Sequence, residues 1–236
     1  FRSPHHTTSR IGLIGGGSTP APGEISLSHR GVLFLDEFPE FPRSVLESMR
    51  QPLEDGVVTI SRAAGSHTFP ARFLLLAASN PCPCGYLGHP KKPCTCAPGI
   101  VNRYKKRISG PLLDRIDLHL DVPPVEVAEL SEDYSSESSA VVQGRVMIAR
   151  DRQNTRYANT PITFNSEMRS SDIKKYCTIT DEAQTILHSA VQKLLLSARS
   201  YFKIIKVAQT IADLECSESI KPYHVAEALQ YRVQES

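Results

Sequence analysis

The stretch Gly31-Val32-Leu33-Phe34-Leu35-Asp36-Glu37-Phe38 decides the fold class of this chain. Its apolar part, residues 32–35, runs without polar alternation, which is typical of a strand covered on both faces in a parallel sheet. The run ends on two adjacent carboxylates, Asp36 and Glu37. Because α/β sheets bind ligands in the crevice beyond the carboxyl ends of their strands, this pair is expected to face a ligand site. The pattern therefore predicts an α/β protein with chemistry at one edge of its sheet.

The segments that follow extend this α/β pattern. A second apolar run, residues 73–79, ends on the amide of Asn80 and is expected to be another buried strand. Between the two runs, segments 57–61 and 68–73 flank a Gly-containing tip, which predicts a β-hairpin. Residues 1–30 are rich in Gly, Pro and Ser and are expected to be mainly loop. Apolar periodicity adds further elements, namely helices at 22–29, 44–53 and 98–109 and a strand at 118–122.

The second half of the chain has a different composition. Two prolines are followed by abundant Ser, Glu and Asp, so residues 125–140 are interpreted as a linker. Beyond this linker the apolar residues recur at helical spacing, and good helix starts occur at Thr180 and Pro222. The expected helices lie at 141–157, 166–176, 180–196, 198–215 and 222–233. The predicted organisation is an α/β core over 1–124 and an all-helical domain over 141–236.

Bulk composition excludes some classes of function. The 236 residues are 40% hydrophobic and 22% charged, which is ordinary for a globular protein, and the net charge of +2 demands no polyanionic partner. No apolar run approaches the roughly 20 residues that span a bilayer, so no membrane partner is expected. The chain opens without a signal peptide, which favours the cytoplasm, and without an initiator Met, which suggests a fragment of a longer protein.

The acid pair and Asn80 fit the chemistry of nucleotide hydrolysis. That reaction needs one carboxylate near Mg²⁺, here Asp36, and a second to polarise the attacking water, here Glu37. An amide at Asn80 can orient the water or contact the γ-phosphate without competing for Mg²⁺. The alternatives are a strand that simply ends at a surface acid pair and an Asn-Pro turn that closes a strand.

Two arginines are candidates for contact with the nucleotide. Arg115, in Leu-Leu-Asp-Arg-Ile-Asp, is able to stabilise the charge on a neighbouring subunit's γ-phosphate. Arg199 lies between two predicted helices, from which it could close a helical domain onto nucleotide. The alternatives are a surface Asp–Arg pair of little energetic value and a solvated arginine at a helix end.

Four cysteines predict a metal site. Cys82 and Cys84 are separated by nine residues from Cys94 and Cys96, and four thiolates on two turns can complete a tetrahedral structural Zn²⁺ site. His89 is a possible substitute ligand. The alternatives are free thiols in a reducing loop and disulfides formed after purification. Of the other candidates, Cys177 and Cys216 are expected to be core thiols, and His5 and His6 to be polar loop residues.

Cations gather near the cysteines. Six of them lie within 17 residues and can contact phosphates: Lys91, Lys92, Arg103, Lys105, Lys106 and Arg107. The hairpin tip, with Arg62 and His67, is a second candidate surface for DNA. The alternative in both cases is a solvated charged face.

In this order and at these spacings, the motifs resemble the AAA+ family, and within it the magnesium-chelatase-like ATPases of the ComM/YifB type. The similarity covers nearly the whole chain and is carried by residues 1–7, 22–27, 31–42, 50–54, 69–73, 80–86, 109–118 and 208–214. It implies a P-loop-type parallel sheet core followed by a helical lid, and a hexameric ring that binds ATP and Mg²⁺ between subunits. It also implies a DNA motor that acts in recombination or transformation.

The resemblance assigns a role to each candidate. Asp36 and Glu37 form the Walker B pair, and Asn80 acts as sensor 1. Arg115 is implied to be a finger acting in trans, and Arg199 to be sensor 2. The hairpin over 57–72 looks like the pre-sensor hairpin of replicative helicases, whose basic tip, here Arg62, projects into the ring channel.

One departure from the family pattern concerns the phosphate loop. The family carries Gly-x-x-x-x-Gly-Lys-Ser/Thr upstream, whereas Gly15-Gly16-Gly17-Ser18 lacks the lysine and precedes the wrong element. The core is therefore expected to be incomplete, with its N-terminal part missing, and this chain alone to be inactive as an ATPase. Two other functions stay open, the ATPase subunit of a magnesium chelatase and a non-enzymatic zinc-bearing interaction module.

Overall fold

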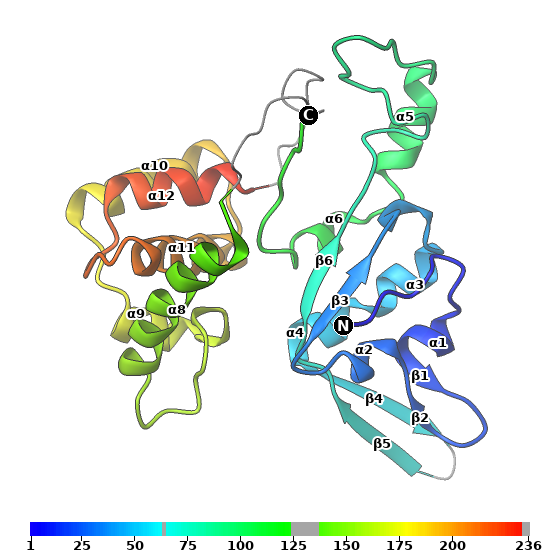
Figure 1. The fold of residues 1–236 in the computed structure, drawn as a ribbon, viewed down its shortest axis with the longest axis horizontal. Coiled ribbons are helices and arrows are strands. Elements are labelled where there is room, and N and C mark those ends of the chain that lie inside the picture. The colour runs from blue at the N-terminus through cyan, green and yellow to red at the C-terminus, as the bar shows by residue number, and fades with distance from the viewer. Residues whose placement is uncertain (63–64, 124–136, 233–236) are drawn as a thin grey trace. The chain divides into compact units, whose positions relative to one another are not determined.

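The structure is a computed structural model that describes residues 1–62, 65–123 and 137–232 (Figure 1). The chain divides into two compact units, unit 1 (Phe1–Ile116) and unit 2 (Asp117–Ser236). No described helix is long and apolar enough to cross a membrane. The division reflects contacts within the chain, so core, linker and lid as functional parts stay predictions.

The centre of unit 1 is a short parallel sheet. Strand β3 (Val32–Leu35) pairs with β6 (Leu74–Ala77), with Val32 opposite Leu74 and Leu35 opposite Ala77. The two apolar runs are therefore confirmed as parallel strands. Their burial differs, because Leu33 and Leu35 of β3 are fully buried whereas Leu74 and Leu76 of β6 are 57% and 46% exposed. The prediction that β6 is a buried strand is wrong for the residues that the structure describes.

The predicted hairpin is confirmed and is tighter than expected. Strand β4 (Val57–Arg62) pairs antiparallel with β5 (Gly65–Pro70), from Val57 opposite Pro70 to Arg62 opposite Gly65. The two tip residues, 63 and 64, lie outside the described residues. Gly65 has a φ of 140°, a value that residues other than glycine rarely adopt.

The first 30 residues are mainly loop, as expected, and the helix expected at 22–29 is present in shorter form, but the segment also contains regular elements that were not expected. Strand β1 (Gly15–Gly16) pairs with β2 (Ala21–Pro22). A Cβ on Gly15 would lie 2.5 Å from the carbonyl oxygen of Ala21, so glycine permits this close approach of the two backbones. Two short helices flank the pair, α1 (Arg10–Ile14) and α2 (Glu24–Leu27).

Helices pack beside the sheet. The helix expected at 44–53 is two helices, because Pro52 cannot donate a backbone N–H to Ser48 and its ring crowds that carbonyl. The helical elements of this part of unit 1 are η1 (Phe38–Glu40), α3 (Arg43–Ser48), α4 (Arg50–Asp55), α5 (Pro98–Lys105) and α6 (Gly110–Leu113). The core beneath them includes Leu33, Leu35, Phe38, Leu46 and Met49. In Figure 1 the β4–β5 hairpin and α5 project from opposite ends of unit 1.

Unit 2 is helical, and its helices lie close to their predicted positions. They are α8 (Ser139–Arg156), η2 (Asn165–Glu167), α9 (Ser170–Tyr176), α10 (Asp181–Lys193), α11 (Ala198–Leu214) and α12 (Pro222–Gln230). The strand expected at 118–122 is absent, a correction to the prediction, since this described segment joins no sheet and exposes Leu120 by 68% and Val122 by 87%. Most of the expected linker, residues 124–136, lies outside the described residues.

A buried carboxylate organises the centre of unit 2. Asp213 on α11 is fully buried and accepts hydrogen bonds from Arg156, Asn165 and Gln209. The distances from Arg156 Nη1 and Asn165 Nδ2 to Asp213 Oδ2 are 2.8 and 2.9 Å. Because a buried carboxylate is costly unless paired and hydrogen-bonded, this network fixes how α8, η2 and α11 pack.

Candidate functional site

The carboxylate edge, which we define as Asp36, Glu37 and Asn80, lies where β3 and β6 end. Two backbone hydrogen bonds tie these ends together, from Ala78 N to Leu35 O at 3.0 Å and from Phe38 N to Ala78 O at 2.9 Å. All three side chains belong to exposed residues. Since β3 and β6 are parallel and in register, the carboxyl ends of both strands open onto the same side of the sheet. The edge can thus present two carboxylates and one amide to a common ligand.

Glu37 has an unusual backbone conformation. Its φ and ψ are 51° and 43°, in the left-handed region that costs a non-glycine residue about 1 kcal/mol. Its backbone N–H donates to Asp36 Oδ1 at 2.8 Å, which stabilises the turn. This turn leads directly into η1, so the orientation of the Glu37 carboxylate depends on how η1 packs.

A histidine contacts the carboxylate edge from a distant part of the sequence. His6 Nδ1 lies 2.9 Å from Glu37 Oε2. The segment before it runs beside β3 through two backbone hydrogen bonds, Arg2 N to Val32 O and Phe34 N to Arg2 O, both 2.9 Å long. His6 was expected to be only a polar loop residue, because local periodicity carries no information about a contact between distant segments.

The N-terminal segment is also held by an ion pair. The guanidinium of Arg2 donates twice to the Glu24 carboxylate, from Nε and Nη2, at 2.6 Å each. These hydrogen bonds from Arg2 hold the pKa of Glu24 below its ordinary value of 4.5. Arg2 thereby fixes the strand-like segment from which His6 reaches Glu37.

The two candidate arginines differ in their surroundings. Arg115 is only 13% exposed, forms an ion pair with Glu54 and donates from Nη1 to Pro111 O at 2.7 Å. Its buried Nε has no hydrogen-bond partner among the residues that the structure describes. Arg199 lies in the first turn of α11 in unit 2 and is exposed. A cation at a helix N-terminus opposes the helix dipole, so the helix itself gains nothing from Arg199.

The cysteine group, Cys82, Cys84, Cys94 and Cys96, comes together in the loop between β6 and α5. All four sulfurs lie within 4.8 Å of one another. The Sγ of Cys82 is 3.4 Å from that of Cys84 and 3.7 Å from that of Cys94, and the Sγ atoms of Cys84 and Cys94 are 3.6 Å apart. Four sulfurs about 2.3 Å from one Zn²⁺ in a tetrahedron lie roughly 3.8 Å apart. The residues present therefore fit a zinc ion.

The cysteines of the group differ in acidity, because the pKa of Cys84 is lowered whereas burial and hydrogen bonds with neighbouring sulfurs raise the pKa values of Cys94 and Cys96. Backbone hydrogen bonds at Tyr86 and Thr95 lower the pKa of Cys84 to about 5. His89, the predicted substitute ligand, does not belong to the group that the described residues form. Its Nδ1 instead accepts from the backbone N–H of Lys91 at 3.0 Å and of Lys92 at 3.1 Å, so the ring closes the loop.

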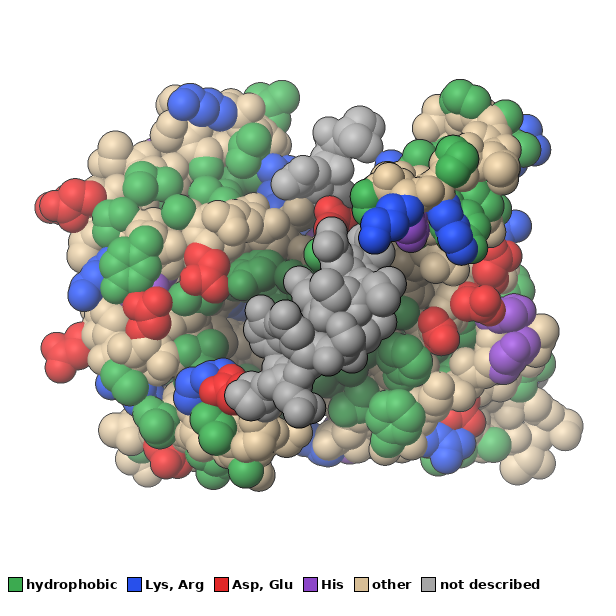
Figure 2. Space-filling model, turned by 45° about the horizontal axis from the view of Figure 1, so that its top comes forward, with side chains coloured by type: hydrophobic (Ala, Val, Ile, Leu, Met, Phe, Trp, Pro, Cys, Tyr) green, Lys and Arg blue, Asp and Glu red, His purple; other side chains and the backbone are tan. Residues whose placement is uncertain are grey.

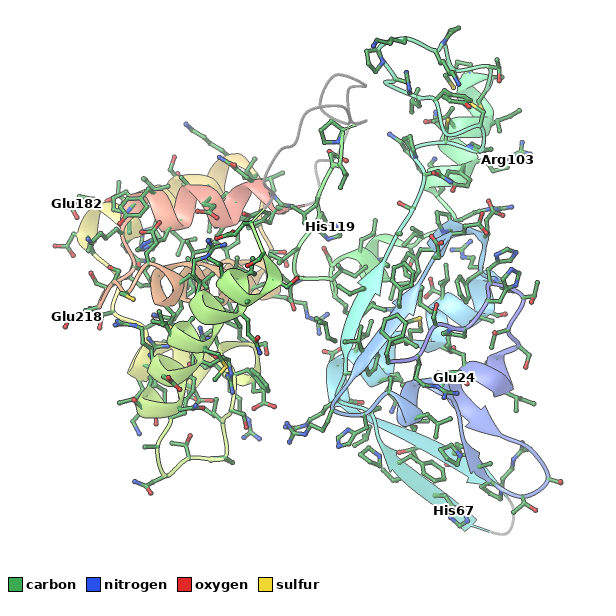
Figure 3. The ribbon with its side chains drawn as sticks, viewed as in Figure 1. Glu24, His67, Arg103, His119, Glu182 and Glu218 are labelled. Carbon is green, nitrogen blue, oxygen red and sulfur yellow. The ribbon has the colours of Figure 1, made fainter. Side chains whose placement is uncertain are left out.

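The basic surface, which comprises Lys91, Lys92, Arg103, Lys105, Lys106 and Arg107, lies on the cysteine loop and around α5. Figure 2 shows Lys and Arg side chains gathered on this lobe of unit 1, and Figure 3 shows Arg103 on α5. Arg107 alone of this set reaches the turn after the carboxylate edge, where it donates to Glu40 Oε2 at 2.5 Å.

The second candidate DNA surface is the hairpin. Arg62 is the last residue of β4, is exposed and lies next to the tip. His67 lies on β5 near the same end of the hairpin (Figure 3). The hairpin thus offers one cation and one imidazole well away from α5.

Comparison with known proteins covers almost the whole chain. A family model described as magnesium chelatase, subunit ChlI, matches residues 1–130, and a model of the C-terminal part of that subunit matches residues 136–232. The protein YifB of Salmonella typhimurium is 44% identical over 234 residues, which are 98% of this chain and 45% of YifB. The competence protein ComM of Haemophilus influenzae is 45% identical over 234 residues, again 98% of this chain and 45% of ComM.

A more distant match has a different name. The DNA replication licensing factor mcm-6 of Caenorhabditis briggsae is 24% identical over an alignment of 232 positions that covers 88% of this chain and 25% of that protein. The chain spans less than half the length of YifB, ComM and mcm-6.

Proposed function

Because the chain belongs to the family of magnesium chelatase subunit ChlI, in the group of YifB and ComM, we propose that it is part of an AAA+ ATPase motor acting on DNA. The activity belongs to the whole protein, of which this chain forms the core after the phosphate loop and the helical lid. The motor works as a hexameric ring, and its task is branch migration or unwinding in recombination or transformation.

The observation that carries this proposal is the parallel pairing of β3 with β6, which ends on the carboxylate edge. Asp36 offers the oxygen ligands that Mg²⁺ prefers, and the bound ion would offset phosphate charge. Glu37 accepts the proton of the attacking water, and Asn80 orients that water. The exposure of all three residues supports this assignment, because the nucleotide has to reach them from outside the sheet.

The arginines complete the site when subunits assemble. Arg115 exchanges its ion pair with Glu54 for the nucleotide of a neighbouring subunit, and its unpartnered buried Nε marks it as imperfectly satisfied in the single chain. Arg199 contacts nucleotide from the lid. ATP therefore binds between subunits, and removing either arginine lowers turnover.

The chain by itself is inactive. The sequence contains no Gly-x-x-x-x-Gly-Lys-Ser/Thr motif, so no backbone cradle and lysine are present for the β- and γ-phosphates. Titration of this chain with ATP tests this directly. Micromolar affinity with turnover would contradict it.

DNA is the proposed substrate of the motor. Two of the relatives are named as a competence protein and a DNA replication licensing factor. This chain has two candidate DNA surfaces, the basic surface and the hairpin. Arg62 at the hairpin tip and the basic surface around α5 contact backbone phosphates without reading sequence.

Zinc is the proposed occupant of the cysteine group. Sulfur separations close to tetrahedral values support a closed structural site, whose ion would cross-link the loop between β6 and α5. Its role is to hold the lobe that carries the basic surface.

One experiment separates the three candidate functions. The full-length protein is assayed for ATP hydrolysis with and without forked DNA, and again with a porphyrin-binding partner subunit. Stimulation by DNA supports the motor, and stimulation only by the partner supports a magnesium chelatase subunit. Absence of ATP binding and turnover under every condition supports a non-enzymatic zinc-bearing module and overturns the proposal.

A further inference from the structure

A cavity of about 410 Å³ lies between α5 and the segment that follows η1, within unit 1. Its charged lining consists of one carboxylate, Glu40, and four cations: Arg43, Arg103, Lys106 and Arg107. Phe41 and Pro42 form the apolar part of the wall. The four cations all belong to exposed residues, so a ligand can reach the cavity from solvent.

The arrangement of the cations favours a phosphate ligand. Arg103, Lys106 and Arg107 lie three and four residues apart at the end of α5, so they share one face, and Arg43 approaches from the start of α3. Arginine forks match the oxygens of a phosphate in pairs, and like charges around one cavity repel each other until an anion enters. Glu40 is the one carboxylate in the wall and pairs with Arg107.

The cavity is connected to the carboxylate edge through η1, the short helix that directly follows Glu37. Arg107 Nη1 donates to Glu40 Oε2 at 2.5 Å and to Pro39 O at 3.2 Å, and both acceptors belong to η1. Glu37 immediately precedes η1. A phosphate bound to Arg107 would compete with Glu40 for its guanidinium, and Glu40 belongs to the element that directly follows Glu37.

Resting on the proposed function, we propose that this cavity is a subsite for a backbone phosphate of DNA, and that its occupancy is transmitted to Glu37 through the Arg107–Glu40 pair. The basic surface therefore contains two kinds of cation. Those in the cavity couple DNA to ATP hydrolysis, whereas those outside it only add affinity. Arg43, which sequence analysis did not assign, belongs to the first kind.

Two adjacent lysines provide a matched test. Lys105 and Lys106 are consecutive, both belong to the basic surface, and only Lys106 lines the cavity. In the full-length protein, Lys106→Glu and Arg43→Glu are compared with Lys105→Glu, using a fluorescent forked DNA over a range of salt. The cavity variants should bind this DNA about tenfold more weakly, with a slope of log affinity against log salt reduced by about one.

The coupling between DNA binding and ATP hydrolysis is measured as the ATPase rate with saturating DNA divided by the rate without DNA. Lys106→Glu and Arg43→Glu should lose most of this stimulation, and Lys105→Glu should keep it. Glu40→Gln, which frees Arg107 and η1, should raise the rate without DNA towards the stimulated rate. Zinc content and thermal unfolding verify that each variant is folded, and the milder Lys106→Gln replaces any that is not.

The outcomes separate the two proposals. A wild-type protein that neither hydrolyses ATP nor binds forked DNA overturns the proposed function. Lys105→Glu is expected to weaken DNA binding as well, so the two lysines are distinguished by DNA stimulation alone. An active wild type in which Lys105→Glu and Lys106→Glu lose this stimulation equally at saturating DNA, or in which no cavity variant binds DNA more weakly, overturns the cavity proposal alone. Weakened DNA binding with full stimulation in every cavity variant overturns the coupling.

Discussion

The cysteine group and the carboxylate edge, both in unit 1, are built in opposite ways. The cysteine group takes four ligands from 15 consecutive residues and is complete within one loop. The carboxylate edge takes Asp36 and Glu37 from one strand, Asn80 from another, and a contact from His6 in a third segment.

The difference lies in what each site still lacks. The proposed zinc ion would find four cysteine ligands in this chain, so that site would need nothing from a neighbour. The carboxylate edge is exposed, and the sequence contains no Gly-x-x-x-x-Gly-Lys-Ser/Thr motif to accompany it. We infer that the first site stabilises the fold and the second waits for groups supplied on assembly. Each prediction below tests one side of this contrast.

The largest expected effect is on the carboxylate edge. Glu37→Gln in the full-length protein removes the proton acceptor and should lower ATP turnover by roughly 100-fold or more. ATP affinity and zinc content should stay within twofold of wild type, because glutamine keeps the size of the side chain and Glu37 lies outside the cysteine loop. A turnover within threefold of wild type would remove Glu37 from the catalytic role.

In the cysteine group, by contrast, a substitution should change the zinc content. Cys82 is fully buried, and Cys82→Ser in this chain should reduce bound zinc from about one per chain to a small fraction, because a serine hydroxyl is a poor ligand for Zn²⁺. Cys216→Ser is the control and should retain zinc, since Cys216 in unit 2 is exposed and is not the core thiol that was expected. Equal zinc in both variants, measured after reduction without chelator, would contradict the site.

The third prediction concerns the contact between the edge and the N-terminal segment. His6→Ala should reduce the kcat for ATP by about three- to tenfold with little change in KM, because the Glu37 carboxylate loses a partner that orients it. His5 is not a suitable control because its ring packs against that of His6, with centroids 4.0 Å apart. His188→Ala is the control instead, since that exposed ring lies on α10 in unit 2 and hydrogen-bonds with Gln184. His6→Asn, which can still donate to the carboxylate, should recover part of the rate. If both alanine variants behave alike, His6 is not a positioning residue.

The same contrast explains how much the sequence could predict. The cysteines are close in sequence, so their clustering needed only a turn, and the strand-end carboxylates followed from an apolar run. The pair Arg107–Glu40 joins residues 67 apart, and Arg115–Glu54 joins residues 61 apart. Contacts of this kind depend on how elements pack, and apolar periodicity carries no information about them.

Two errors have a related origin. Residues 118–122 alternate like a strand but join no sheet in the part of the chain that the structure describes, so a strand pattern without a neighbour does not form a ladder. The glycines at 15 and 16 were interpreted as loop residues, whereas they form a ladder with Ala21 and Pro22 that only small residues allow. Local pattern predicts what a segment can form, and packing decides what it does form.

The smallest expected effect is on the ion pair that anchors the N-terminal segment. Hydrogen bonds from Arg2 lower the pKa of Glu24 below 4.5, so the pair stabilises the fold above that pH and the contribution is lost as pH falls through the folded-state pKa. Arg2 is 42% exposed, so solvent screens the pair and its contribution to stability at pH 7 should be small. Glu24→Gln should therefore be slightly less stable than wild type at pH 7 and nearly equal to it at a pH well below 4.5.

Denaturant unfolding of this chain at the two pH values measures that difference, with Glu182→Gln on α10 as a control in unit 2 (Figure 3 labels both residues). A stability gap that stays constant on acidification would mean that Glu24 acts through packing and not through charge. If the gap closes as expected, the segment that brings His6 to Glu37 is held partly by a titratable surface pair. The carboxylate edge would then depend on pH and salt, while the cysteine group, held by ligands within one loop, would depend on zinc.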